Sequence, residues 1–351
     1  MVDGAGAVRY SCLMHDITEF IRDMPKAELH LHIEGTLEPE LKFTLAERNR
    51  VPLRQASAAE MRASYAFDDL TSFLVRYYEG MGVLQTAEDF YDLAWAYLER
   101  AHGERVRYAE IFFDPQAHTS RGVAFENVVG GLRRAVVEAR RRFDLRVQLI
   151  MCLLRDHSAE YGMATLVQSL PYREWIAGVG LDSDEKGNPP EKFAAVFRRA
   201  RAEGYQITMH CDVDQENSVE HIRQCLDMIG VDRVDHGVNI LESEELTAEL
   251  KRRGLGLTVC PISNRWCTGD TKAAQIKRLL DLGIRVTVNS DDPAYFAGYV
   301  TDNLITAQQA AGLDAAELVR LQRNAIEIAW LPAAVREQLL TEIDQYTASA
   351  L

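Results

Sequence analysis

Short, continuous apolar runs recur along the chain, each bounded by polar residues or glycine. There are eight of them: Ala27–Gly35, Val106–Pro115, Val147–Arg155, Ile176–Asp184, Tyr205–Asp212, Arg233–Ile240, Leu255–Ser263 and Arg285–Pro293. Unbroken apolar runs, rather than alternating ones, are typical of parallel strands that are buried on both faces. The pattern therefore predicts eight parallel β-strands.

Segments with the 3.6-residue period of amphipathic helices lie between most of these runs. Examples are residues 126–143, 190–204, 218–230 and 273–283, and the last three end at a glycine. Eight strands alternating with helices predict an α/β protein with a (β/α)8 TIM-type barrel. Residues of about 36–105 contain further helical segments, so we expect a helical insertion after the first strand that caps one end of the barrel. No internal repeat or linker interrupts the pattern, which favours a single domain over residues 1–351.

Polar residues follow the predicted strands where each apolar run stops. In a barrel of this type the chemistry lies at the carboxyl ends of the strands. Four of the nine histidines end such runs, at positions 30, 32, 210 and 236, and Asp291 ends the last one. His30 and His32 are two residues apart, so their imidazoles point to the same face of a strand.

The composition of these strand ends favours one metal over others. Three histidines and one carboxylate (His30, His32, His210 and Asp291) suit Zn²⁺ better than Mg²⁺ or Ca²⁺, which prefer oxygen ligands. The same ligands tolerate iron, manganese or cobalt. We expect one zinc ion per chain, and its bound water would have a pKa lowered toward neutrality.

Net charge and hydropathy exclude some classes of binding partner. The formal net charge is −14, which argues against a nucleic-acid backbone or an anionic membrane as a default partner but does not identify a substrate. No apolar stretch approaches the length of a membrane span, and the amino-terminal residues lack the pattern of a signal peptide. We therefore expect a cytoplasmic protein.

Five motifs together resemble the adenosine/adenine deaminases of the amidohydrolase superfamily. They are PKAELHLHIEGTLEP, MH, VDHG, LTVCPISN and VTVNSDDP, and the resemblance runs from about Met24 to beyond Asn303. YAEIFFDPQAHTSRGV and VGLDSDEKGNPPEKF look more like the adenine deaminase-type branch than the animal adenosine deaminases.

The resemblance implies a role for each matching residue. It makes His30, His32, His210 and Asp291 the zinc ligands, and His236 the residue that orients and helps to deprotonate the attacking water. Asp292 would hydrogen-bond a purine ring nitrogen, and the Gly180 backbone would contact another. The implied reaction is hydrolytic loss of ammonia from C6 of adenosine, adenine or a related 6-aminopurine or amino-heterocycle.

One position departs from the family. The family's motif is His-Ala-Gly-Glu, in which the glutamate protonates the purine N1, whereas His210 is followed here by Cys211, Asp212 and Val213. Valine has no proton to donate. A displaced carboxylate, Asp212, Asp214 or Glu216, could take over through a changed loop path. An equally good interpretation is that at least one of Asp212 and Asp214 caps the helix that begins near residue 217.

The valine at position 213 also leaves two further functions open. The protein could be a metal-dependent hydrolase of the same fold that cleaves a different C–N or C–X bond, already activated for attack. It could also be a metal- or purine-binding protein with little deaminase activity. Elsewhere, His118 and His221 fit surface positions, Glu34 fits a surface or cap role, and Asp182 fits a place at the barrel rim.

Overall fold

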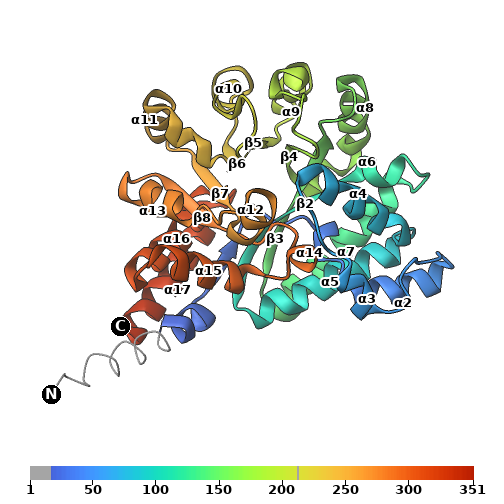
Figure 1. Cartoon of the computed structure of the whole chain (residues 1–351), viewed down its shortest axis with the longest axis horizontal. Helices are drawn as coiled ribbons and strands as arrows, with labels where there is room; N and C mark the ends of the chain where they lie inside the picture. Colours follow the sequence, from blue (N-terminus) through green and yellow to red (C-terminus); the bar gives the residue numbers. More distant parts are fainter. Residues whose placement is uncertain (1–16, 212) are drawn as a thin grey trace.

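A computed structural model describes residues 17–211 and 213–351, and it confirms the barrel (Figure 1). Eight parallel strands are hydrogen-bonded in sequence order. They are β1 (Lys26–Glu28), β2 (Val106–Phe113), β3 (Arg146–Leu154), β4 (Ile176–Asp182), β5 (Gln206–Cys211), β6 (Arg233–His236), β7 (Gly256–Val259) and β8 (Arg285–Val288). A bridge between Leu31 and Asp291 joins the first strand segment to the last, so the sheet closes on itself.

The first strand is shorter than the apolar run predicted. Regular pairing ends at Glu28, because the Leu29 backbone N–H donates to the Asn289 side chain (2.9 Å) instead of to a neighbouring strand. The chain then runs on in an extended course, with His32 bridged to Phe112 of β2. Backbone hydrogen bonds to β2 on one side and to Asp291, in the turn after β8, on the other therefore hold the His-x-His segment in place.

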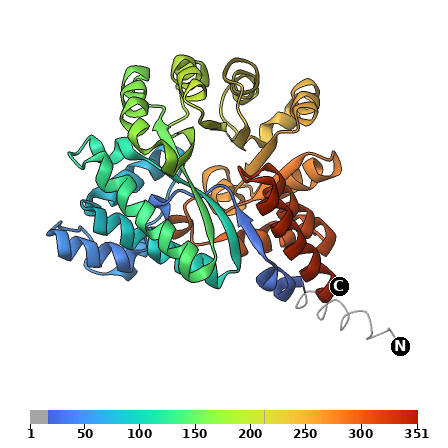
Figure 2. The same ribbon diagram turned by 180° about the vertical axis from the view of Figure 1, so that it is seen from behind.

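Helices surround the barrel, and Figure 2 shows the outer ring from behind. The ring includes α7 (Phe125–Phe143), α8 (Ala159–Ser169), α9 (Ala194–Ala202), α10 (Ser218–Arg223), α11 (Glu244–Arg253), α13 (Ala273–Asp281), α15 (Val300–Ala311), α16 (Ala315–Ile328) and α17 (Ala333–Ala350). In α7 the residues Val128, Leu132, Ala135 and Ala139 lie three or four positions apart and are buried. This stripe packs the helix against the sheet while the arginines between them face outward.

The predicted helical insertion lies between β1 and β2. It contains α2 (Pro39–Asn49), α3 (Ala58–Ala63), α4 (Leu70–Gly80) and α5 (Ala87–Gly103). Capping boxes at Asp69 and Thr86 fix where α4 and α5 begin. Phe73 of α4 packs on Phe296 and Tyr295, with ring centroids 4.8 and 5.7 Å away. Both partners lie in α14 (Pro293–Phe296), directly after β8, so α4 covers the carboxyl end of the barrel.

Two histidines are more deeply placed than the sequence suggested. His118, in α6 (Pro115–Thr119), and His221, in α10, are both buried, which corrects their expected surface positions. Among residues 17–211 and 213–351, no helix is both long and apolar enough to cross a membrane.

Candidate metal and active site

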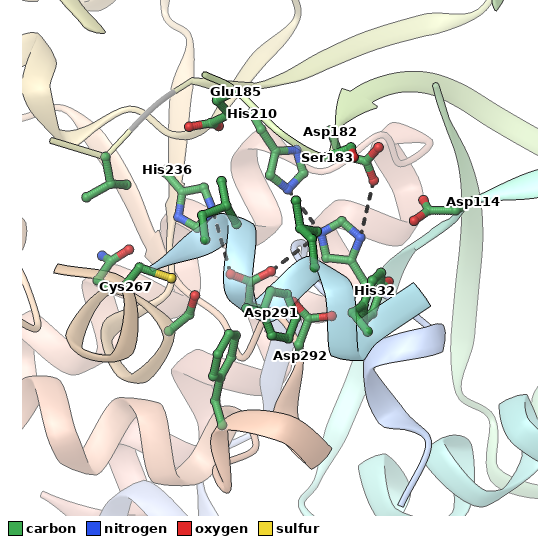
Figure 3. Close-up of a pocket in the computed structure, with 18 of the residues that line it drawn as sticks. His32, Asp114, Asp182, Ser183, Glu185, His210, His236, Cys267, Asp291 and Asp292 are labelled. Carbon is green, nitrogen blue, oxygen red and sulfur yellow. Dashed lines mark hydrogen bonds and ion pairs between the residues drawn. The ribbon is translucent and has the colours of Figure 1, made fainter. Parts of the chain in front are cut away.

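The barrel brings the four predicted metal ligands together at the carboxyl ends of its strands. His30 and His32 come from the segment after β1, His210 from β5 and Asp291 from the turn after β8. The closest ligand atoms of these four side chains all lie within 4.8 Å of one another, and all four residues are buried. Figure 3 shows His32, His210 and Asp291 converging on one point.

The spacing of the donor atoms fits a zinc ion. His32 Nε2 lies 3.0 Å from His210 Nε2 and 3.4 Å from Asp291 Oδ1, and His30 Nε2 lies 3.2 Å from the same oxygen. Ligands about 2.1 Å from a tetrahedral Zn²⁺ are about 3.4 Å apart. A buried group of three imidazoles and a carboxylate also matches the donor preference of zinc. The residues present therefore fit the metal that the sequence predicts.

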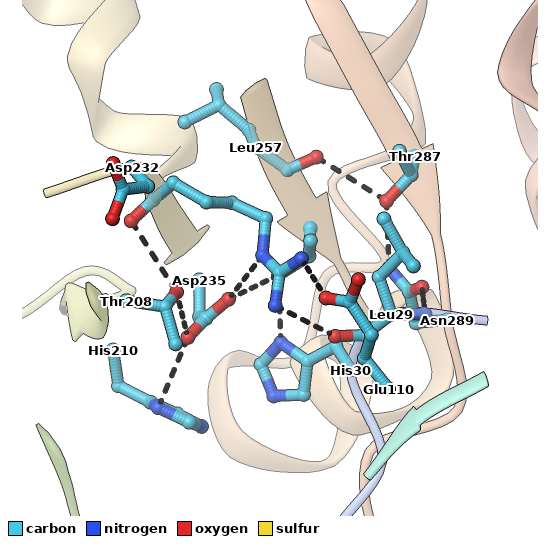
Figure 4. A network of polar contacts seen from close by, with 12 residues as sticks. Leu29, His30, Glu110, Thr208, His210, Asp232, Asp235, Leu257, Thr287 and Asn289 are labelled. Atoms are coloured by element: carbon cyan, nitrogen blue, oxygen red, sulfur yellow. Dashed lines mark hydrogen bonds and ion pairs between the residues drawn. The ribbon is translucent and has the colours of Figure 1, made fainter. Parts of the chain in front are cut away.

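A buried network behind the ligands fixes the rings (Figure 4). His30 Nδ1 is 2.9 Å from the Thr258 hydroxyl, which itself donates to Asp235 Oδ1 (2.8 Å). Asp235 also lies near His210, with 3.8 Å between Oδ2 and Nδ1, and accepts from Thr208 at 2.6 Å. Such partners orient ligand imidazoles and leave the other ring nitrogen facing the metal.

Burial keeps most of these imidazoles neutral. Desolvation lowers the pKa of His32 to about 4 and places that of His210 well below its usual value, with the neighbouring His30 adding to the effect on His210. For Asp291, burial opposes ionisation, but His30 and then His236 hold its pKa well below the usual range. Neutral imidazoles beside an ionised carboxylate are the protonation states in which these groups bind metal.

His236 and Asp292 lie beside the four ligands without belonging to that cluster. His236 Nε2 is 3.6 Å from Asp291 Oδ2, and burial lowers the pKa of His236 to about 4. Burial and the neighbouring Asp291 carboxylate raise the pKa of Asp292 well above its usual value. His236 and Asp291 both have left-handed backbones, with φ of 58° and 66°. Non-glycine residues rarely adopt this conformation, and those that do concentrate at functional sites.

A cavity opens over these four side chains. Its wall combines polar residues from the strand ends with apolar residues from α4 and neighbouring turns. Those residues are His32, Leu70, Phe73, Leu74, Tyr77, Tyr78, Asp114, Asp182, Ser183, Glu185, His210, Val213, Gln215, His236, Ser263, Asn264, Cys267, Asp291, Asp292 and Phe296. Phe73, Leu70 and Leu74 of α4 supply apolar surface from the insertion.

The wall next to His32 is acidic. Asp182 Oδ2 is 3.5 Å from His32 Nδ1, and burial raises the pKa of Asp182 to about 7. Burial and the nearby Asp182 raise the pKa of Asp114 well above its usual value. Behind them, the buried Glu34 accepts from the Asp114 backbone and lies 2.9 Å from His118 Nε2. Glu34 therefore organises the interior, which corrects its expected surface or cap role.

One predicted substrate contact, Gly180, lies away from the cavity. Gly180 is inside β4, where a Cβ would meet Cys152 Sγ at 2.6 Å, so it faces the barrel interior. The same segment instead presents Asp182, Ser183 and Glu185 to the cavity. A backbone contact from Gly180 to a substrate therefore has no support in this arrangement, because the chain reaches the cavity only after the strand ends.

The carboxylates near Val213 do not occupy the place of the family's glutamate within the described residues. Asp214 is exposed and its carboxylate is bonded to Lys272 and, at 3.2 Å, to Asn239 Nδ2. It neither lines the cavity nor caps α10, whose first turn has no side-chain cap. Asp212 lies outside the described residues. Val213 does line the cavity, so an apolar side chain occupies the wall there.

Sequence reasoning missed Glu185 and Arg155. Glu185 was one of several acidic residues in a polar loop, and Arg155 ended an apolar run with no sign of a role. Both are buried, and Glu185 Oε1 lies 3.6 Å from Arg155 Nη1. The only available signal was the position of each residue just beyond the carboxyl end of a predicted strand.

Comparison with known proteins agrees with this geometry. The chain matches the sequence profile described as adenosine deaminase over residues 25–346. It is 49% identical to an uncharacterized deaminase of Schizosaccharomyces pombe, over 96% of this chain and 99% of the relative. It is 48% identical to an adenine deaminase of Cupriavidus taiwanensis, over 94% of each chain. The solved adenine deaminase of Arthrobacter aurescens superposes with a TM-score of 0.89 at 42% identity, covering 93% of this chain and 99% of that one.

Proposed function

The chain belongs to the adenosine deaminase family, and from this premise we propose that it hydrolytically deaminates adenine or a closely related 6-aminopurine, releasing ammonia. One observation supports this most directly. Three histidines and Asp291 form a buried donor cluster under a cavity, with His236 and Asp292 beside it. Relatives of similar sequence and fold are named adenine deaminases, which supports our choice of the free base rather than its nucleoside as the substrate of this chain.

We assign the metal as zinc, held by His30, His32, His210 and Asp291. The ion, when bound, supplies a water whose pKa is lowered toward neutrality. The assignment to zinc rests on the donor set, since imidazole nitrogens and one carboxylate suit Zn²⁺ better than the alkaline-earth ions.

Residues around the metal ligands transfer protons and bind the substrate. His236 is a neutral imidazole 3.6 Å from Asp291, so it can accept a proton from the attacking water and pass it to the departing amine. The Asp292 carboxyl group faces the cavity and can hydrogen-bond a ring nitrogen. Phe73, Leu70 and Leu74 cover the opening with apolar surface suited to the face of a heterocycle.

A second candidate is favoured by one observation, the apolar Val213 in the cavity wall. Without a proton donor a purine would bind but turn over poorly, since general acid–base catalysis contributes roughly 10²–10⁴-fold. The protein would then be a purine- or metal-binding relative of the deaminases, or a hydrolase of an already activated C–N or C–X bond.

Ammonia release by the zinc-loaded protein separates these candidates. The panel is adenine, adenosine, N6-substituted adenines and other amino-heterocycles, with chelator-treated protein as the control. We expect adenine to be turned over with the highest kcat/KM, and no release after the metal is removed. Tight adenine binding by calorimetry without ammonia release would reject the deaminase and support the binding protein.

We also place the protein in the cytoplasm. Four cysteines (Cys152, Cys211, Cys225 and Cys260) are buried in the interior, as expected for reduced thiols in a reducing compartment. The acidic net charge of −14 accords with a small-molecule substrate rather than a nucleic acid.

A further inference from the structure

Val213 leaves the proposed reaction without its expected proton donor, and the cavity itself offers a candidate. Within the described residues, five carboxylates line the wall: Asp114, Asp182, Glu185, Asp291 and Asp292. Asp291 faces the other metal ligands and Asp292 follows it. Asp114 and Asp182 lie on the side of His32. Of these five, Glu185 is the one on the side of His210 and His236 (Figure 3). Val213, three residues after His210, also lines the cavity.

Arg155 connects Glu185 to the strand that leads to Val213. The Arg155 side chain is buried, with Nη1 3.6 Å from Glu185 Oε1. The same Nη1 donates to the His210 backbone carbonyl at 2.9 Å. One guanidinium thus holds the Glu185 carboxyl group next to the carboxyl end of β5, three residues before Val213.

The loop that presents Glu185 is internally braced. Arg155 Nε donates to the Asn188 carbonyl (2.8 Å), and the Asn188 backbone N–H donates to the Glu185 carbonyl (3.1 Å). Lys192 Nζ donates to the Arg155 carbonyl (2.8 Å) and to Asn188 Oδ1 (3.0 Å). A carboxyl group on such a loop is held in place before substrate arrives, which is what acid catalysis needs.

We propose that Glu185 is a catalytic residue that replaces the family's motif glutamate, contacting the ring nitrogen next to the carbon that is attacked. The proposal rests on the deaminase function argued above. The Glu185 carboxyl proton moves to the ring nitrogen as the water oxygen bonds to C6. Of the two water protons, one leaves with the amine as ammonia and the other returns to Glu185. The donated proton stays on the ring nitrogen of the 6-oxo product, so the net reaction is water in and ammonia out.

Glu185→Gln is the direct test, assayed on zinc-loaded protein with the best substrate of the panel. Removing the proton while keeping the size should lower kcat roughly 10²–10⁴-fold. KM should change only a few-fold and the metal content should equal that of the native chain. Glu191→Gln, in the same segment but exposed, is the matched control and should leave kcat unchanged.

A second test places a carboxyl group at position 213 in the variant that lacks the Glu185 carboxyl group. Because Val213 also lines the cavity and holds the position of the family's glutamate, Val213→Glu in the Glu185→Gln background should recover at least tenfold of the lost kcat. Glu185→Asp keeps the acid on a shorter chain and should be intermediate. It also covers the case in which Glu185→Gln does not fold.

Three results would overturn the proposal. Glu185→Gln with a kcat close to the native value would show that this carboxyl group has no part in the reaction. A loss confined to Asp212→Asn would assign the acid to that residue instead. A native chain that releases no ammonia from any substrate would reject the proposed function together with the acid, whereas a fully active Glu185→Gln rejects only the acid.

Discussion

Individual side chains are oriented by their partners in the cluster that we propose as the metal site. His30 is held at Nδ1 by the Thr258 hydroxyl, and that hydroxyl in turn donates to Asp235. The threonine therefore fixes both the ring angle and the nitrogen that faces the other ligands. Removal of the hydroxyl leaves the imidazole free to rotate without changing any ligand.

Thr258→Val should weaken zinc binding by roughly 10–100-fold, the usual effect of losing a partner behind a metal ligand. Competition with a chromophoric chelator measures the affinity. Thr341→Val is the control, since that exposed hydroxyl bonds only to the Glu337 carbonyl of its own helix. An unchanged zinc affinity in Thr258→Val would show that Thr258 does not orient His30.

Residues that end apolar runs could be identified from the sequence, and residues positioned by distant partners could not. His30, His210 and Asp291 stand where a strand meets the barrel mouth, so their convergence follows from the topology. Glu185 depends on Arg155, thirty residues earlier in the chain, and nothing in its own neighbourhood indicates that contact. His118 looked like a surface residue because its partner, Glu34, comes from the other side of the insertion.

At the scale of elements, α4 is held over the cavity by its contacts with the loop after β4. The Tyr78 hydroxyl donates to the Ser183 hydroxyl at 2.8 Å, and the Thr71 hydroxyl donates to Asp184 at 3.3 Å. Tyr78 and Ser183 both line the cavity. Two hydrogen bonds thus fix the helix that supplies much of the apolar wall.

Tyr78→Phe should raise KM a few-fold while kcat stays within about twofold, since one neutral hydrogen bond contributes about 1 kcal/mol. Steady-state ammonia release with the best substrate measures both. Tyr161→Phe is the matched control, because its hydroxyl is 3.1 Å from Thr119 on elements away from the cavity. If the two variants behaved alike, α4 would not depend on this contact for its position.

The elements that periodicity predicted are those with long, one-sided apolar patterns. All eight strands and the helix of residues 125–143 lie at the segments that the pattern predicted, but β1, β6, β7 and β8 are only three or four residues long and end well before their apolar runs do. The first strand is shorter because side-chain contacts from Asn289 interrupt its ladder. The helix predicted over residues 218–230 begins as α10 and continues as a π-helix over Gln224–Ile229. The two helix types differ in their backbone hydrogen bonds, and the spacing of apolar residues did not distinguish them.

For the whole molecule, the barrel interior contains a buried charge network rather than an entirely apolar core. Arg233 of β6 pairs with Glu110 of β2 and with Asp235, with 3.4 Å between Nε and Oδ1. It also donates to the Leu29 carbonyl at 3.2 Å, so a single side chain connects three sides of the barrel. All three charged groups are fully buried.

Arg233→Met should lower the free energy of unfolding by about 3–5 kcal/mol, because it leaves two buried carboxylates without a counter-charge. Denaturant titration of metal-loaded protein measures the change. Arg199→Met removes an exposed pair with Glu203 and should cost at most about 1 kcal/mol. Equal losses in both variants would mean that the interior network adds nothing to stability.

Burial of titratable groups also makes the stability of the metal-free protein depend on pH. The pKa of His236 shows in which direction the stability changes. Its pKa falls from the usual 6.5 to about 4 on folding because burial disfavours the imidazolium. Between pH 6.5 and pH 4 the His236 imidazole is protonated in the unfolded chain but stays neutral in the folded chain. The stability from a neutral His236 is therefore complete above pH 6.5 and is lost as the pH falls toward 4.

Chelator-treated native protein should accordingly lose about 3 kcal/mol more unfolding free energy between pH 6.5 and pH 4 than chelator-treated His236→Asn, which has no group to titrate there. Comparing the two chains cancels the opposite tendency of His30, whose pKa is raised because Asp291 outweighs burial. Denaturant unfolding at a series of pH values gives both curves. Parallel curves would mean that His236 takes up its proton without cost in the folded state, and that its imidazole is then charged, rather than neutral, in acidic solution.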